Sequence, residues 1–240
     1  MRVLQVIIGK ELKTAFYSWF TYIIFILSLG IIGFRIWLSY ANIFNVGEVS
    51  LSSLFYTLSL SLFFTIPFFT MKSISEELRT GTFELLTSKP VSLWDIIGGK
   101  FMANIILIAL FLLLTLIHYI TIASLSHIDY AVVLCGYLGL ILLGGCYVSI
   151  GLFASSLTHQ PIVALVIHFC IAIWFQFIFQ IGADFGGDGH VATFLNYLSL
   201  GEHFNTLSRG IIDSRSLVYL FSVSMLFLAL THYRVRQPKH

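Results

Sequence analysis

Charged residues are scarce in this sequence. Lysine, arginine, aspartate and glutamate make up 10% of its 240 residues, against roughly 25% in an ordinary soluble domain. A chain with so few charges and a mean hydropathy of +0.94 cannot cover a water-facing surface of this size. The net charge of +2 is also too small to indicate a nucleic-acid-binding protein. The composition therefore excludes most soluble classes and favours an integral membrane protein.

Cysteine is also rare, and its placement argues against disulfide or metal chemistry. Cys135, Cys146 and Cys170 all lie within apolar runs, and no CxxC pair occurs. We interpret them as small packing residues, and we expect no metal site. The N-terminus does not resemble a cleavable signal peptide, because charged residues interrupt its first apolar stretch and no small-residue cleavage site follows.

Enzymatic and nucleotide-binding motifs are missing as well. There is no GxxxxGK[ST] loop, and Gly98-Gly99-Lys100 is followed by Phe101 at the start of an apolar run. The sequence also lacks the HExxH and GxSxG motifs. We therefore expect no enzyme activity in this chain and no cofactor bound to it.

Two other kinds of membrane protein, an intramembrane protease and a secondary transporter, have only weak support in the sequence. An intramembrane protease is suggested by EELR at residues 76–79, which looks like the EExxxR motif of one protease class. The spacing is wrong, and the partner histidine motifs are missing. A secondary transporter would usually show repeated halves and buried acidic residues. No acidic residue lies centrally in an apolar run here.

The apolar runs are long enough to cross a bilayer. A transmembrane helix needs about 20 mainly apolar residues. Six segments meet this criterion, near residues 19–40, 53–73, 96–123, 131–157, 161–182 and 217–233. The sequence therefore predicts an all-α membrane protein with six transmembrane helices.

The distribution of lysine and arginine predicts the orientation of these spans. With both termini in the cytoplasm, ten of the 13 basic residues lie inside: Arg2, Lys10, Lys13, Lys72, Arg79, Lys89, Lys100, Arg234, Arg236 and Lys239. Arg35, Arg209 and Arg215 lie outside. This split follows the positive-inside rule, and the reverse orientation violates it.

Three segments outside the spans have recognisable patterns. Residues 1–16 place apolar side chains at helical spacing, which favours an amphipathic helix on the inner membrane surface over a ragged extension of the first span. We expect residues 17–240 to form the six-helix transmembrane domain that follows. Within it, an outer segment at residues 183–214 combines glycines with apolar residues and predicts short helices at the outer leaflet.

The most charged stretch is the predicted cytoplasmic loop at residues 75–95. A short helix can begin near Thr82 and must end before Pro90. Ser92 and Asp95 form a capping box for the next helix. Phe83, Leu85, Leu86 and Trp94 are unusually apolar for a solvated connector. These features predict a compact helical elbow that docks against a cytoplasmic protein, rather than a simple linker.

This loop carries a resemblance to a known family. Residues 76–101 read EELRTGTFELLTSKPVSLWDIIGGKF. They resemble the signature loop of permease subunits of ABC-2 type ATP-binding-cassette transporters, particularly the gliding-motility-associated and nitrous-oxide-reductase maturation permeases. Residues 9–13, GKELK, and residues 199–219, SLGEHFNTLSRGIIDSRSLVY, also resemble that group. The resemblance covers nearly the whole chain.

The resemblance implies a fold, partners and a mechanism. It implies the ABC-2 (type V exporter-like) permease fold, in a multi-pass protein of the bacterial cytoplasmic membrane. ATP and magnesium would bind a separate ATPase subunit. Two such subunits would join a homodimer or heterodimer of permeases, in some systems with a periplasmic accessory protein. The expected coupling contacts to the ATPase are Glu76, Glu77, Arg79, Gly81, Thr82, Glu84 and Leu85.

Polar residues and glycines inside the spans form further patterns. Ser53, Thr57, Ser61 and Thr65 recur every four residues in the second span, and His168, Gln176 and Gln180 share a stripe in the fifth. The family resemblance implies that these two helices lie at the dimer interface and along the substrate route. The stripes therefore either line that route or form interhelical hydrogen bonds, and the ionisable His168 favours the route. The fourth span contains five glycines that predict close helix packing: Gly136, Gly139, Gly144, Gly145 and Gly151.

Overall fold

The computed structural model describes residues 2–38, 51–88, 91–123, 130–185 and 189–237. Every regular element in these ranges is helical. Six helical segments in the described residues are long and apolar enough to cross a membrane. They consist of α2 (Trp19–Trp37), α4 (Leu51–Thr70), α7 (Leu93–Ala123), α8 (Tyr130–Leu157), α9 (Pro161–Ile173) with its continuation through α10 (Phe179–Phe185), and α13 (Ser214–Arg236). The prediction of a six-span helical protein is confirmed.

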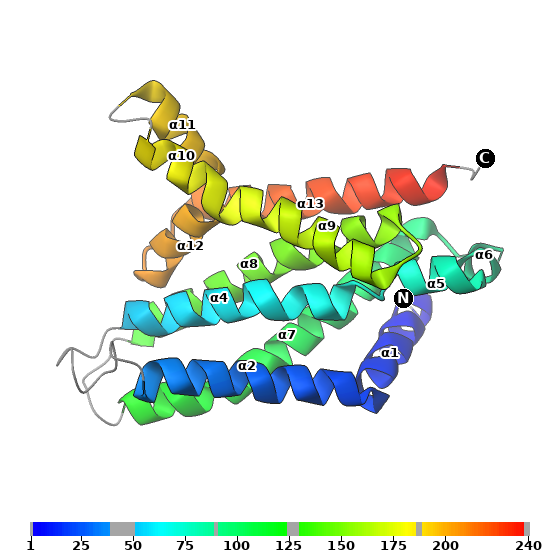
Figure 1. Cartoon of the computed structure of the whole chain (residues 1–240), viewed down its shortest axis with the longest axis horizontal. Helices are drawn as coiled ribbons and strands as arrows, with labels where there is room; N and C mark the ends of the chain where they lie inside the picture. Colours follow the sequence, from blue (N-terminus) through cyan, green and yellow to red (C-terminus); the bar gives the residue numbers. More distant parts are fainter. Residues whose placement is uncertain (1, 39–50, 89–90, 124–129, 186–188, 238–240) are drawn as a thin grey trace.

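The spans run alongside one another, and the short helices gather at the two ends (Figure 1). One end carries α1 (Arg2–Tyr17), α5 (Ser75–Thr80), α6 (Thr82–Thr87) and the C-terminal end of α13. We call this the elbow end. The opposite end carries α10, α11 (His190–Leu198) and α12 (Leu200–Ser208). Both chain termini thus lie at the elbow end.

The fourth span, α8, forms the centre of the bundle and packs against α4, α7, α9, α12 and α13. Its glycines allow these close approaches. A Cβ atom at Gly136 would lie 2.5 Å from ring carbons of Phe55 on α4, and one at Gly151 would lie 2.7 Å from His168 Nδ1 on α9. Distances below about 3 Å are steric overlaps, so only glycine fits these two positions. The predicted packing role of the glycines is confirmed there.

The fifth span is not a uniform α-helix. A π-helical turn at Trp174–Ile178 separates α9 from α10. Such turns insert an extra residue into the helical repeat and shift the faces on either side. Residues 174–178 contain no proline or glycine, so nothing in the sequence at the break itself signals this turn.

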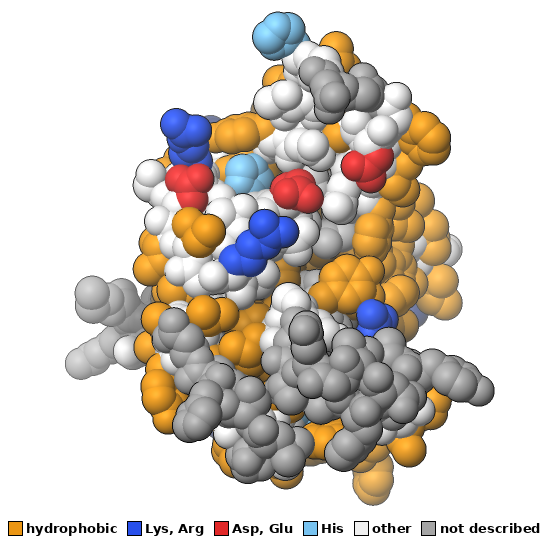
Figure 2. All heavy atoms as spheres, turned by 90° about the vertical axis from the view of Figure 1, so that its left-hand side faces the viewer, with side chains coloured by type: hydrophobic (Ala, Val, Ile, Leu, Met, Phe, Trp, Pro, Cys, Tyr) orange, Lys and Arg blue, Asp and Glu red, His pale blue; other side chains and the backbone are white. Residues whose placement is uncertain are grey.

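The end opposite the elbow carries the predicted short helices of the outer segment. Asp184 of α10, Glu202 of α12, Arg209 and Asp213 between α12 and α13, and Arg215 at the start of α13 lie at this end. Figure 2 shows acidic and basic side chains gathered on one half of this face, with hydrophobic side chains along the flanks. His203 lies in this segment as a structural residue, with Nδ1 at 3.0 Å from Ser216 Oγ and its ring stacked on Tyr219.

Candidate functional site: the elbow between α4 and α7

The elbow consists of two short helices joined by a single glycine. Helix α5 ends at Gly81, whose φ of 71° is in the left-handed region that favours glycine, and α6 begins at the next residue. The hydroxyl groups of Thr80 and Thr82 lie 2.9 Å apart across this turn. The predicted helix near Thr82 is confirmed as α6, while α5 was not predicted as a separate helix. The sequence does contain a signal for the end of α5, because Gly81 directly follows Ser75–Thr80 and glycine commonly ends a helix.

A serine of the central span anchors the start of the elbow. Ser155 Oγ on α8 accepts hydrogen bonds from the backbone N–H groups of Ile74, at 3.0 Å, and Ser75, at 2.9 Å. The same hydroxyl donates to the carbonyl of Met71 at 3.1 Å. One side chain therefore satisfies three backbone groups at the junction of α4 and α5. A displacement of α5 would have to break these bonds or move α8 with it.

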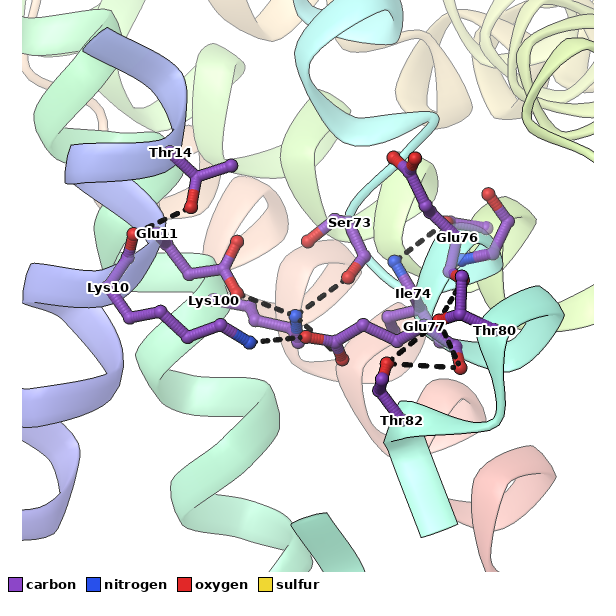
Figure 3. A network of polar contacts seen from close by, with 12 residues as sticks. Lys10, Glu11, Thr14, Ser73, Ile74, Glu76, Glu77, Thr80, Thr82 and Lys100 are labelled. Atoms are coloured by element: carbon purple, nitrogen blue, oxygen red, sulfur yellow. Dashed lines mark hydrogen bonds and ion pairs between the residues drawn. The ribbon is translucent and has the colours of Figure 1, made fainter. Parts of the chain in front are cut away.

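A buried ionic network ties the elbow to α1 and α7 (Figure 3). Lys100 on α7 is 1% exposed, and its Nζ donates to Glu11 Oε1 on α1 and to the Ser73 carbonyl, each at 2.7 Å. Glu77 Oε2 on α5 lies 3.0 Å from the same nitrogen, as an ion pair without aligned hydrogen-bond geometry. Glu77 Oε1 accepts from Lys10 Nζ at 2.9 Å.

The network balances its charges within the chain. Two ammonium groups face two carboxylates, drawn from three helices that are distant in sequence. Partial burial opposes the charge on Lys10, but the hydrogen bond and negative charge of Glu77 outweigh it and raise the pKa of Lys10 above its ordinary value. Both residues are therefore charged at neutral pH. The result is an ionic link between the amphipathic helix, the elbow and the third span.

The predicted coupling residues divide between two surroundings. Arg79, Gly81, Thr82 and Glu84 are exposed at the elbow end. Glu76 is partly exposed and lies 3.6 Å from Arg79, whereas the Glu77 side chain is 14% exposed and points into the ionic network. The side chain of Leu85 lies outside the described part of the structure. The roles of all seven as ATPase contacts stay predictions, with Glu77 also bound inside the chain.

The burial and contacts of the apolar loop residues differ in part from the prediction. Phe83 is 5% exposed and belongs to the hydrophobic core, and Leu86 packs against it. The expectation that Phe83 is left for a docking partner is therefore wrong, because α6 turns that side chain into its own protein. Trp94 stays partly exposed and stacks on His232 of α13, with ring centroids 4.6 Å apart. The predicted pairing of Ser92 with Asp95 is confirmed, at 2.7 Å between Ser92 Oγ and Asp95 Oδ2.

Within the described residues, Thr65 of the polar stripe in the second span forms a hydrogen bond to a neighbouring helix. Thr65 lies 2.7 Å from Ser28 of α2, between the two hydroxyl oxygens. Thr57 donates to the carbonyl of Ser53 within α4, at 2.8 Å. The buried Ser61 hydroxyl has no hydrogen-bond partner among the described residues.

The polar stripe of the fifth span faces other helices of the same chain. Gln176 accepts from the hydroxyl of Tyr147 at 2.8 Å, and Gln180 donates to Glu202 at 3.3 Å. His168 is 1% exposed, and neither ring nitrogen has a partner in the described part of the chain. The observed bonds are of the interhelical kind. A role of either stripe in a pathway or dimer interface stays a prediction.

The chain was compared with families of known proteins. A family model described as ABC-2 family transporter protein matches residues 5–234. The chain belongs to the ABC-2 transporter family. No curated protein matches it. The match extends from the amphipathic helix α1 to the end of α13, so the ionic network and the elbow both lie within the family region of this permease.

Membership of this family makes the chain a multi-pass membrane permease and implies an ATP-binding-cassette ATPase as its partner. Permeases of this family are normally the non-enzymatic membrane component. The narrower resemblance to gliding-motility and nitrous-oxide-reductase maturation permeases stays a prediction.

The residues that sequence reasoning missed are the inner partners of the elbow: Lys10, Glu11, Lys100 and Ser155. One signal for them was available, because Lys100 is an ionisable residue inside a predicted span, where such residues usually have a specific partner. The sequence contained no means of choosing Glu11, 89 positions earlier, as that partner.

Proposed function

We propose that this permease is coupled to a separate ATPase subunit through the elbow formed by α5 and α6, and that it carries substrate outward across a bacterial cytoplasmic membrane. The observation that carries the proposal is the ionic network of Lys100, which connects the elbow to α1 and α7. An exposed elbow held in this way can transmit a displacement of a docked subunit to the membrane spans. Nucleotide and magnesium would be held by that subunit.

The proposed orientation places the elbow end in the cytoplasm. Its support is the distribution of described basic residues, since Arg35, Arg209 and Arg215 lie at the opposite end and the elbow end carries Lys10, Lys13, Lys72, Arg79, Lys100, Arg234 and Arg236. Basic residues concentrate on the cytoplasmic side of membrane proteins. Both termini would then be cytoplasmic.

Cysteine labelling tests this orientation. In a variant without the native cysteines, Thr82→Cys is expected to react with a membrane-impermeant maleimide in inverted membrane vesicles and not in intact spheroplasts. Arg209→Cys, which is exposed at the opposite end, is expected to show the reverse pattern. Labelling of Thr82→Cys from outside intact spheroplasts would contradict the proposed orientation.

Charge reversal in the elbow tests the coupling itself. Glu84 is exposed on the first turn of α6. We expect Glu84→Arg to reduce the ATP hydrolysis of the purified permease–ATPase complex by about tenfold or more, because a reversed charge in a docking surface opposes close approach of the partner. The variant is expected to retain the expression level and unfolding temperature of the unmodified chain.

A matched control separates coupling from general charge effects. Asp184→Arg makes the same change of charge at an exposed position of the opposite end. We expect its complex to hydrolyse ATP at the unmodified rate. Equal hydrolysis and equal partner binding by Glu84→Arg and the unmodified chain would overturn the role of this residue in coupling.

The proposed assembly contains two permeases and two ATPase subunits. Six spans form half of a transport pathway in transporters of this type, so a second permease is needed, identical or related. The exposed apolar faces of α2 and α9 are available to lipid or to that second subunit. A periplasmic accessory protein would meet the face formed by α10, α11 and α12.

A further inference from the structure

A cavity of about 320 Å³ lies at the elbow end, between α1, α2, α4, α5 and α7. It adjoins the ionic network, but several of its lining groups are not used by that network. This volume is within the range of small-ligand sites in proteins. The cavity is formed by the chain alone and involves only described residues.

One wall of the cavity is polar and incompletely satisfied. Ser73 is 8% exposed, its hydroxyl has no hydrogen-bond partner among the described residues, and it lies between the α1 and α5 side chains of the network (Figure 3). A buried hydroxyl without a hydrogen-bond partner destabilises the folded protein unless a ligand or a water molecule bonds to it. The position of Ser73 on the cavity wall therefore points to a polar group inside the cavity.

The wall also presents one cation and one carboxylate that do not pair with each other. Lys72 forms no ion pair with any described residue, and its Nζ lies 5.5 Å from the ring centroid of Phe20. Glu76 has only the loose contact to Arg79 at 3.6 Å among its described ion pairs. The other charges on the wall, at Lys10, Glu11 and Glu77, neutralise one another and Lys100. The residual charges of the wall are thus the Lys72 cation, which has no ion pair with a described residue, and the Glu76 carboxylate, which is partly neutralised by Arg79 from outside the cavity.

Another part of the wall is aromatic and belongs to the spans, beside polar lining residues such as Thr21 and Asn104. Phe20, at the start of α2, and Phe68, near the end of α4, meet edge to face with ring centroids 6.0 Å apart. Phe20 is exposed, so this part of the wall continues onto the surface of the spans that faces acyl chains. A ligand with a charged head and an apolar tail would contact both the charged and the aromatic parts of the wall.

We propose that this cavity binds a phospholipid of the cytoplasmic leaflet with a primary-amine headgroup, of the phosphatidylethanolamine type. The phosphate would be held by Lys72 and the Ser73 hydroxyl, the ammonium group by Glu76, and an acyl chain would lie along Phe20 and Phe68. A net-neutral headgroup with separate opposite charges matches the residual charges of the wall. The placement in the cytoplasmic leaflet rests on the orientation proposed above, while binding itself does not depend on an ATPase.

Lipid retention tests this proposal on the full chain without its partner. The purified protein is equilibrated with mixed micelles containing equal amounts of phosphatidylethanolamine, phosphatidylcholine and phosphatidylglycerol. It is then repurified, and its bound lipid is quantified by mass spectrometry. We expect phosphatidylethanolamine to be enriched about tenfold over the other two lipids, as a charge-assisted hydrogen bond allows. Equal retention of the three lipids would overturn the proposal.

Variants assign the contacts. Lys72→Ala and Ser73→Ala are expected to lose most of the enrichment, Lys72→Arg to keep it, and Glu76→Gln to lose the discrimination against phosphatidylglycerol. The matched control is Arg234→Ala, which removes a cation at an exposed position of the same end, outside the cavity. Unchanged enrichment in Lys72→Ala, or an equal loss in Arg234→Ala, would overturn the assignment to this cavity.

A separate competition experiment tests the role of the acyl chain. Glycerophosphoethanolamine, which has the same headgroup without acyl chains, is expected to leave bound phosphatidylethanolamine in place at equal concentration. If it displaces the lipid as well as phosphatidylethanolamine does, the site recognises a soluble headgroup and the lipid proposal is wrong. Since no ATPase is present, none of these results depends on the coupling function of the elbow.

Discussion

Replacement of Lys100 by methionine is expected to lower the thermal unfolding midpoint of the purified permease by about 10 °C. The side chain is 1% exposed and contacts Glu11, Glu77 and the Ser73 carbonyl. Removal of one partner from a buried ion pair costs about 3–5 kcal/mol. In this variant Glu11 loses its ammonium partner and Glu77 keeps only Lys10. For a chain of this length each kcal/mol shifts the midpoint by about 2–4 °C.

Two further variants show whether the effect comes from unpaired charge. Lys13→Met makes the same substitution at an exposed position of α1 and is expected to change the midpoint by less than about 2 °C. The triple variant Lys100→Met, Glu11→Gln, Glu77→Gln removes both carboxylates and is expected to recover part of the loss. A midpoint for Lys100→Met equal to that of Lys13→Met would show that the network does not stabilise the fold. The measurement is tryptophan fluorescence during heating in mild detergent.

Replacement of Gly136 by alanine is expected to lower the same midpoint by about 5–10 °C, since overpacking in a close-packed interior costs about 1–3 kcal/mol. The added Cβ would lie 2.5 Å from the Cε1 and Cε2 atoms of Phe55, whose buried ring meets Tyr137 edge to face. That ring has no room to retreat, so α4 and α8 must separate.

The same helix supplies the control. A Cβ atom at Gly145 would meet its nearest neighbours at 3.7 Å, an ordinary contact distance, so Gly145→Ala is expected to leave the midpoint nearly unchanged. Phe55→Leu shortens the opposing side chain, and we expect the double variant Gly136→Ala, Phe55→Leu to be more stable than the sum of the single changes predicts. Equal midpoints for Gly136→Ala and Gly145→Ala would contradict the packing described for α4 and α8.

The spans of this protein could be predicted from the sequence because the bilayer imposes a minimum length and an apolar composition on each one. The observed helices begin and end within a few residues of the predicted ranges; the end of the first predicted span, at residues 39–40, lies outside the described residues. Local signals also worked where one residue decides the backbone. Pro161 opens α9, and Ser92 immediately before α7 pairs with Asp95 in its first turn.

Features that depend on contacts between distant residues could not be predicted in the same way. The exposure of Phe83 was predicted wrongly because nothing in the local pattern shows that α6 faces the core. The partners of Lys100 lie on α1 and α5, and no periodicity links these positions. The π-helical turn at Trp174–Ile178 likewise has no proline or glycine within it.

The central claim is that this permease works with a separate ATPase that docks at the elbow. Its most direct measurement is purification of the tagged, unmodified chain from its host membranes, followed by identification of bound proteins and an assay of ATP hydrolysis and vesicle transport. We predict a co-purifying subunit with a GxxxxGK[ST] loop, whose ATP hydrolysis drives transport. A chain that purifies without any such subunit, and whose vesicle transport runs on a proton gradient without ATP, would contradict the claim.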